Sequence, residues 1–163
     1  MDLSIVIPLY NESESIDELN TSINSVLYNL NIEYELIYID DGSTDNSWQK
    51  IREVSKNHPK TYACKFLKNY GKSMALSAGF KKSKGKVVIT MDADLQDDPN
   101  EIVPLYNMIK NDDYDLVSGW KKKRYDSIIF KNIPSKLFNW AARRASGVKL
   151  NDFNCGIKAY KSS

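Results

Sequence analysis

Short apolar segments that alternate with amphipathic helical stretches constrain the fold of this chain more than any other feature. Four such segments cover residues 3–9, 34–40, 86–91 and 114–119, and a weaker fifth covers 61–67. They are rich in β-branched residues and apolar at successive positions, which is typical of parallel strands buried on both faces. Helical periodicity covers the intervals at 15–30, 45–57, 71–83 and 100–112. The alternation predicts an α/β fold with a mostly parallel sheet and helices on both faces.

Length and composition indicate one globular domain. A chain of 163 residues can bury a sizeable core, and an apolar fraction of 42% excludes extensive disorder. No apolar run approaches the ~20 residues of a membrane-spanning helix, and the first residues lack the basic region of a signal peptide. Two cysteines, Cys64 and Cys155, lack metal-ligand spacing. They predict a reducing compartment, so we expect a cytoplasmic location.

Polar clusters follow four of the predicted strands at the point where each strand ends. Their sequences are PLYNES, DDGSTDNS, DADLQDDP and WKKKR. Ligands of open α/β sheets bind outside the carboxyl ends of the strands, so we expect the clusters to gather at one edge. Chance supplies one such cluster easily, whereas four at four strand ends indicate a ligand site.

The third cluster predicts a site for a divalent cation. Asp92 and Asp94 follow a buried strand at i and i+2, a spacing that points both carboxylates the same way in an extended segment. Two adjacent carboxylates share a proton or bind a cation, and oxygen ligands favour Mg²⁺ or Mn²⁺. Gln96, two residues further on, adds an amide oxygen. Asp97 and Asp98 are interpreted instead as the cap and first turn of a helix.

The first two clusters predict a nucleoside site. A carboxylate at the end of 34–40, Asp40 or Asp41, can accept hydrogen bonds from a base N–H or ribose hydroxyls. The alternative, an Asx-turn plus a helix cap, explains Asp45 but not both Asp40 and Asp41. Tyr10 offers a flat face for a base and Glu12 an acceptor, although a turn before a helix is the better interpretation of these two residues taken alone. Glycine-rich phosphate loops are absent, and Gly71-Lys72-Ser73 resembles a phosphate turn only weakly. Together the clusters suggest a nucleotide diphosphate ligand.

Several stretches resemble the motifs of family 2 glycosyltransferases, which have the GT-A (Rossmann-like) fold. They are SIVIPLYNESESI, IDDGSTDNS, NYGKSMALSAGF and MDADLQDDP. VSGWKKKRYDS and DFNCGIKAY narrow the resemblance to dolichyl-phosphate mannosyltransferases and bacterial polyprenyl-phosphate glycosyltransferases. The resemblance implies one catalytic domain over 1–163, with a nucleotide-sugar-binding half at 1–120 and the start of an acceptor-side half at 121–163. Because such catalytic domains continue further, it also implies a chain truncated at its C-terminus.

The resemblance assigns roles to individual residues. Five positions would hold the nucleoside: Pro8, Tyr10, Glu12, Ile39 and Asp41. The metal- and sugar-nucleotide motif would be Asp92, Ala93 and Asp94, with Gln96 as a further metal ligand.

The second half supplies the remaining implied roles. Lys121 stands where relatives carry an arginine, so it would contact a phosphate of the nucleotide sugar. Arg124 and Asp126 fit an R-x-D pattern and would join Asp92 and Asp94 as catalytic residues. Lys158 stands where relatives show a phosphate-binding arginine, and lysine is a weaker bidentate donor.

We therefore expect a metal-dependent inverting hexosyltransferase. It would move a sugar from a UDP- or GDP-linked donor to an acceptor, with Mg²⁺ or Mn²⁺ neutralising the departing diphosphate. A polyprenyl or dolichyl phosphate acceptor is already an anion and needs no general base, whereas a glycan hydroxyl needs a carboxylate base. The alternatives are transfer to a sugar hydroxyl in cell-envelope polysaccharide synthesis and a non-catalytic nucleotide-binding module. No nucleic acid is expected as a partner.

The charge distribution suggests where the enzyme acts. Residues 1–120 carry 12 Lys and Arg against 19 Asp and Glu, whereas residues 121–149 carry nine basic residues against Asp126 alone. The basic stretch interleaves its cations with apolar residues such as Phe138 and Trp140, which suits a helix at the inner face of the cell membrane. The alternatives are solvated cations with the apolar side chains packed on the sheet, or a homodimer contact.

Overall fold

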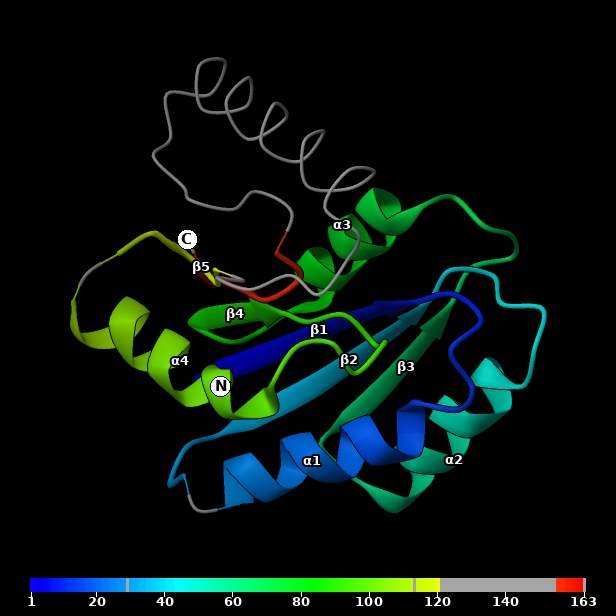
Figure 1. Cartoon of the computed structure of the whole chain (residues 1–163), viewed down its shortest axis with the longest axis horizontal. Coiled ribbons are helices and arrows are strands. Elements are labelled where there is room, and N and C mark those ends of the chain that lie inside the picture. The colour runs from blue at the N-terminus through cyan, green and yellow to red at the C-terminus, as the bar shows by residue number, and fades with distance from the viewer. Residues whose placement is uncertain (29, 113, 121–154, 163) are drawn as a thin grey trace, which may run out of the picture.

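A computed structural model describes residues 1–28, 30–112, 114–120 and 155–162. The described strands form a single sheet of order β3-β2-β1-β4-β6-β5 (Figure 1). Its strands are β1 (Leu3–Leu9), β2 (Tyr34–Asp40), β3 (Thr61–Lys65), β4 (Val87–Thr90), β5 (Leu116–Ser118) and β6 (Lys158–Lys161). The helices are α1 (Ile16–Tyr28), α2 (Ser47–Asn57), α3 (Lys72–Lys82) and α4 (Ile102–Asn111), with the 3₁₀ turn η1 (Pro99–Glu101) before α4.

The α/β fold with a mostly parallel sheet is confirmed. β1 pairs in parallel with β2 and with β4, and β3 pairs in parallel with β2. β1 and β2 cover the same residues as the predicted segments. Because their apolar runs are continuous, they take the centre of the sheet, where both faces are buried.

The prediction for 114–119 was wrong in part. β5 within this segment is a half-buried edge strand of three residues, and its neighbour is the antiparallel β6. β6, which no strand signal predicted, lies between β4 and β5 and runs antiparallel to both. Its four residues have lysine at both ends and Ala159 and Tyr160 between them, and so short a segment gives no clear periodicity.

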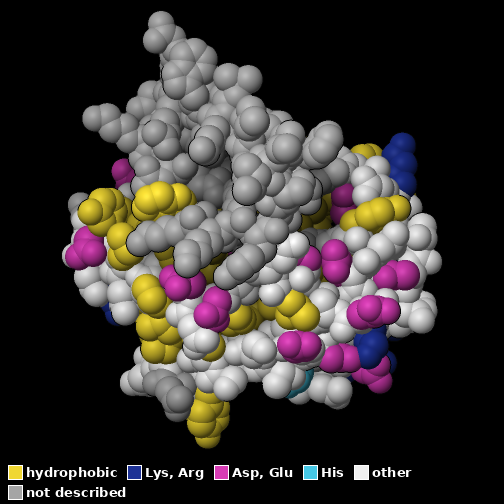
Figure 2. All heavy atoms as spheres, in the orientation of Figure 1, with side chains coloured by type: hydrophobic (Ala, Val, Ile, Leu, Met, Phe, Trp, Pro, Cys, Tyr) yellow, Lys and Arg dark blue, Asp and Glu magenta, His cyan; other side chains and the backbone are white. Residues whose placement is uncertain are grey.

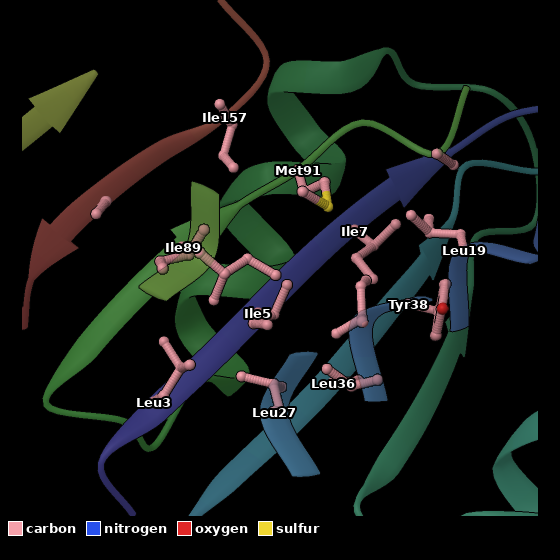
Figure 3. Close-up of a cluster of buried hydrophobic side chains, with 14 of the residues drawn as sticks. Leu3, Ile5, Ile7, Leu19, Leu27, Leu36, Tyr38, Ile89, Met91 and Ile157 are labelled. Carbon is pink, nitrogen blue, oxygen red and sulfur yellow. The ribbon is translucent and has the colours of Figure 1, made fainter. Parts of the chain in front are cut away.

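The sheet has helices on both faces, as predicted. Leu3, Ile5 and Ile7 of β1 point into a large core that also contains apolar side chains of α1, α2 and α4 (Figure 3). On the other face Ile37 and Ile39 of β2 pack against α3. Each fully buried leucine or isoleucine contributes about 1.5–3 kcal/mol. The two cores therefore hold the sheet rigidly between its helices.

Buried polar groups anchor the chain after α3 to the sheet. Ser4 Oγ donates to Glu35 Oε1 at 2.6 Å, and both side chains are buried. The backbone N–H of Lys84 donates to the same Glu35 oxygen at 2.8 Å, and that of Gly85 to Ser4 Oγ at 2.8 Å. Because these bonds fix the C-terminal end of α3, its N-terminal end has a defined position at the opposite edge of the sheet. Across the described residues, no helix is both long and apolar enough to cross a bilayer.

Candidate active site

A cleft of about 290 Å³ opens at the carboxyl ends of β1, β2 and β4. Seven of the predicted site residues line it: Pro8, Tyr10, Glu12, Asp41, Asp92, Ala93 and Asp94. Several Asp and Glu side chains gather on the side of the molecule to which these strand ends point (Figure 2). The prediction that the polar clusters share one edge of the sheet is therefore confirmed for the first three clusters.

Hydrogen bonds between the loops after β1 and β2 place Tyr10 and Glu12. The N–H of Asn11 donates to Ser43 Oγ at 2.9 Å, and that of Glu12 donates to Ser47 Oγ at 2.9 Å. Asn11 has a φ of 57°, in the left-handed region that asparagine tolerates better than most residues. The two loops thus form one rigid rim, from which the half-exposed Tyr10 ring lines the cleft.

Asp41 joins three segments of the chain at the floor of the cleft. Its N–H donates to the carbonyl of Leu9 at 2.8 Å. Its Oδ1 and Oδ2 accept the N–H groups of Tyr70 and Gly71, each at 2.8 Å. The side chain is buried, yet it lines the cleft. Since each carboxylate oxygen has a further lone pair, Asp41 can hold the loop after β3 and still accept a hydrogen bond from a ligand.

Asp40 has a structural role instead. Its Oδ1 accepts the N–H of Ser43 at 2.8 Å, which forms an Asx-turn at this residue. Its Oδ2 lies 3.6 Å from the ammonium of Lys65, and the side chain is fully buried. Of the two adjacent acids, only Asp41 therefore faces the cleft.

Gly42 allows the loop after β3 to approach Asp41. It has a φ of +75°, and a Cβ at this position would lie 2.4 Å from the carbonyl carbon of Lys68 and 2.7 Å from the nitrogen of Asn69. The contact atoms belong to the backbone, so a side chain at position 42 would have to push this loop away. The same loop contributes Asn69 and Gly71 to the lining of the cleft.

We expect Gly42→Ala to lower the free energy of unfolding by roughly 3 kcal/mol or more, measured by urea denaturation. Gly71→Ala is the matched control, because Gly71 has a φ of +91° but open space around its Cβ position. That variant should lose only the cost of backbone strain, about 1–3 kcal/mol. Equal losses in the two variants would contradict the close approach at Gly42.

Asp92 and Asp94 both reach the cleft from the loop after β4. Asp92 Oδ1 lies 2.5 Å from the ammonium of Lys72, the first residue of α3. Asp94 is exposed, and its Oδ1 accepts the N–H of Gln96 at 3.1 Å. Lys72 lines the same cleft. The predicted pair of acids is thus brought together, with a lysine that the prediction did not include.

The extended spacing that suggested Gln96 as a third ligand is not observed. β4 ends at Thr90, and Leu95 has a φ of 60°, so the chain turns after Asp94. Gln96 lines a different hollow of about 200 Å³, beside Trp120. Leucine rarely adopts positive φ, so a sequence pattern predicts no turn here.

The sequence predicts that Asp97 and Asp98 form the cap and first turn of a helix, and the structure confirms this for Asp98 alone. Asp98 caps η1 by accepting the N–H of Asn100 at 2.9 Å, as predicted. Asp97 is buried and does not begin the helix.

Gly156 brings the segment before β6 against the acids of the cleft. A Cβ on Gly156 would lie 2.5 Å from Oδ2 of Asp92 and 2.5 Å from Oδ2 of Asp97. Thr90 Oγ1 donates to its carbonyl at 3.1 Å. The glycine of the CGIKAY motif therefore packs directly against the Asp92 carboxylate. Lys158 of this motif donates to the carbonyl of Cys155 at 2.8 Å and does not line the cleft.

The cleft carries negative charge. Burial raises the pKa of Glu12, and the carboxylates of Asp94, Asp45 and Asp92 raise this pKa further. Within the described residues, no three acidic, histidine or cysteine side chains come close enough to hold a metal ion by themselves. Two carboxylates with oxygen-only donors nevertheless fit Mg²⁺ or Mn²⁺, because these ions complete their shells with water and substrate phosphates.

The remaining predicted residues do not line the cleft or cannot be placed. Ile39 is fully buried beneath it, in the small core against α3. Lys121, Arg124 and Asp126 lie outside the described residues, as does the basic stretch 121–149. Five residues line the cleft without having been assigned to it: Leu9, Asn69, Gly71, Lys72 and Ala75. The one sequence signal for them is Gly71-Lys72-Ser73, which resembles a phosphate turn only weakly.

The parallel sheet and the acidic cleft at its strand ends are the arrangement of a GT-A glycosyltransferase fold. The chain belongs to glycosyl transferase family 2, whose family model matches residues 4–161. It is 34% identical to the dodecaprenyl-phosphate galacturonate synthase of Rhizobium johnstonii, covering 100% of the chain and 48% of that protein. It is 41% identical to the undecaprenyl-phosphate 4-deoxy-4-formamido-L-arabinose transferase of Pseudomonas fluorescens, covering 98% and 46%.

Solved structures support the same fold. A Pyrobaculum calidifontis mannosyltransferase in complex with GDP-Man and Mn²⁺ aligns with a TM-score of 0.69 and 20% identity, covering 98% of the chain and 44% of that protein. A Mycobacterium tuberculosis glucosyl-3-phosphoglycerate synthase in complex with Mn²⁺, UDP and phosphoglyceric acid aligns with a TM-score of 0.74 and 20% identity, covering 98% and 55%. The chain spans about half the length of the curated relatives it matches.

Proposed function

We propose that this chain forms the nucleotide-sugar-binding part of a metal-dependent inverting glycosyltransferase that transfers a hexosyl group to a polyprenyl phosphate. The observation that carries the proposal is the cleft in which Tyr10, Asp41, Asp92 and Asp94 meet at the strand ends. The two curated relatives described above are named for transfers that involve dodecaprenyl or undecaprenyl phosphate, which supports this acceptor class. The base of the donor is uracil or guanine.

The nucleoside lies between the β1 and β2 loops in this proposal. Tyr10 packs against the base, and Asp41 accepts a hydrogen bond from its donor edge. Both bases offer such a donor. The floor is preorganised because Asp41 is already held by Leu9, Tyr70 and Gly71. A fixed acceptor in a partly desolvated cleft contributes more to binding than a mobile one would.

The diphosphate lies beside Asp92 and Asp94. Asp94 is the principal ligand proposed for Mg²⁺ or Mn²⁺, while Asp92 faces the sugar or ribose more than the ion. A bound divalent cation neutralises the charge of the departing diphosphate. Metal ligation by Gln96 remains a prediction. The Gln96 side chain lines a separate hollow, which does not favour this role.

The transfer needs no general base when the acceptor is a lipid phosphate. An acceptor phosphate oxygen, already anionic near neutral pH, forms a bond to the anomeric carbon as the bond from that carbon to the diphosphate oxygen breaks. Attack from the opposite face inverts the configuration. Arg124 and Asp126 are proposed to act on the acceptor side, and Lys121 on a phosphate of the donor.

A thermal-shift screen of UDP- and GDP-linked sugars with and without Mn²⁺ tests the proposal. A donor at about 100 times its Kd adds about 2.7 kcal/mol of stability, which raises the Tm of a domain this size by roughly 5–10 °C. Incorporation of labelled sugar into extracted polyprenyl phosphate then tests the transfer. A shift that is equal without divalent cation argues against metal dependence, and binding without transfer leaves a non-catalytic nucleotide-binding module.

The basic stretch 121–149 leads to a separate prediction about location. Each basic residue near an anionic leaflet contributes about 1 kcal/mol, and salt screens this attraction. We therefore expect binding to anionic liposomes at low salt, release at high salt, and strong weakening in the double variant Arg143→Glu with Arg144→Glu. Co-sedimentation measures all three. Equal binding to neutral and anionic liposomes would discard the membrane role, and self-association in ultracentrifugation would favour the homodimer alternative.

A further inference from the structure

We propose that Lys72 is a phosphate-binding residue that pairs with Asp92 until metal and nucleotide arrive. In the structure its ammonium lies 2.5 Å from Asp92 Oδ1, inside the cleft. In the bound state Asp94 would hold the divalent cation beside Asp92, and the ammonium would leave Asp92 for the oxygens of the nucleoside diphosphate. This inference rests on the proposed function and adds a residue to which the family resemblance assigns no role.

The ion pair does little for the stability of the fold. The side chains of Lys72 and Asp92 are 52% and 30% exposed, and ion pairs in such surroundings stabilise proteins weakly. Lys50 and Asp17 form another exposed ion pair, between α2 and α1 and away from the cleft. The two Lys–Asp pairs have the same chemistry, but only one lies in the cleft. A comparison of the two therefore separates an effect on ligand binding in the cleft from the effect of removing any exposed lysine charge.

The charge of the cleft explains why a lysine is needed there. Among its lining residues that the structure describes, the acids are Glu12, Asp41, Asp92 and Asp94, and Lys72 is the single cation. A diphosphate entering this cleft would meet repulsion from the acids, which one divalent ion only partly offsets. Lysine binds phosphate as a point charge on a flexible stem, so its ammonium can leave one carboxylate oxygen for a phosphate oxygen nearby.

The backbone around Lys72 is held by the residue proposed to bind the base. The N–H of Gly71 donates to Asp41 Oδ2 at 2.8 Å, and the carbonyl of Gly71 accepts the N–H of Met74 at 3.0 Å. The start of α3 is therefore fixed relative to the nucleoside end of the cleft. Only the Lys72 side chain has to move when its partner changes, because the backbone that carries it is already in place.

In the variant Lys72→Met, which keeps most of the apolar stem, we expect the affinity for Mn²⁺ to rise and the affinity for nucleotide to fall. Titration calorimetry with Mn²⁺ alone should show several-fold tighter binding than in the parent, because the competing ammonium is gone. Titration with UDP or GDP in the presence of Mn²⁺ should show binding roughly 10- to 100-fold weaker, because a charged phosphate contact is lost. Lys72→Arg should retain most of the nucleotide affinity. Lys50→Met, the matched control, should change neither affinity.

Thermal denaturation of Lys72→Met checks that the exposed substitution leaves the fold intact. Weaker or unchanged Mn²⁺ binding, or unchanged UDP and GDP binding, in a folded Lys72→Met variant would overturn the inference while leaving the proposed function standing. A variant that keeps the affinity for UDP and GDP but loses transfer to polyprenyl phosphate would place the contact on the acceptor, and would also overturn it. Absence of UDP and GDP binding in the parent protein would overturn the proposed function and this inference together.

Discussion

Replacement of Asp94 by asparagine is expected to abolish the divalent-dependent binding of UDP and GDP. The change keeps the size of the side chain and removes the charge that a hard cation requires. Loss of a residue that only orients a metal ligand weakens metal binding by about 10- to 100-fold, so loss of the principal ligand should cost at least about 100-fold. Titration calorimetry with each nucleotide, with and without Mn²⁺, measures this effect.

Asp98→Asn provides the control for this experiment. Asp98 lies four residues after Asp94, is exposed, and caps η1 through the N–H of Asn100. Asparagine caps helices about as well as aspartate, so both stability and nucleotide binding should stay close to those of the parent. If Asp94→Asn retains the full dependence on Mn²⁺, the metal site must lie elsewhere in the cleft.

The sequence alone predicts the centre of the sheet better than its edge. β1 and β2 are continuous apolar runs buried on both faces, and their bounds coincide with the predicted segments 3–9 and 34–40. β6 is short and comes from the far end of the chain, yet it lies between β4 and β5. Its place depends on pairing with residues about 70 positions away, which no local periodicity encodes.

The candidate site shows the same division between local and distant information. Asp92 and Asp94 could be predicted because an acid that follows a buried strand has a nearly fixed place at the sheet edge. The ion pair of Lys72 with Asp92 joins residues 20 positions apart, and the bonds of Asp41 reach Tyr70 and Gly71 across the fold. Such contacts follow from the packing of α3 on the sheet. The turn at Leu95 was missed because leucine rarely adopts positive φ.

Asp41 should prove the residue on which both the cleft and the binding of the base depend. Removal of its carboxylate in Asp41→Ala leaves the N–H groups of Tyr70 and Gly71 without their acceptor. A hydrogen bond to a charged group typically contributes about 1.5–3 kcal/mol. We expect the free energy of unfolding to fall by about 2–4 kcal/mol, since solvent can reach part of this loop. If Asp41 also accepts a bond from the base, UDP and GDP should bind roughly 10- to 150-fold more weakly.

Asp45→Ala separates these two effects because Asp45 has the same kind of bonds outside the cleft. Its carboxylate accepts the N–H of Ser47 at 2.9 Å and that of Ser13 at 3.2 Å, and it does not line the cleft. Urea denaturation should therefore show that both variants are less stable, while calorimetry at a temperature where both are folded should show weaker nucleotide binding for Asp41→Ala alone. Similar losses of affinity in the two variants would mean that loosened loops explain the effect. Unchanged affinity in Asp41→Ala would place the base pocket elsewhere and leave Asp41 with the structural role that its bonds already define.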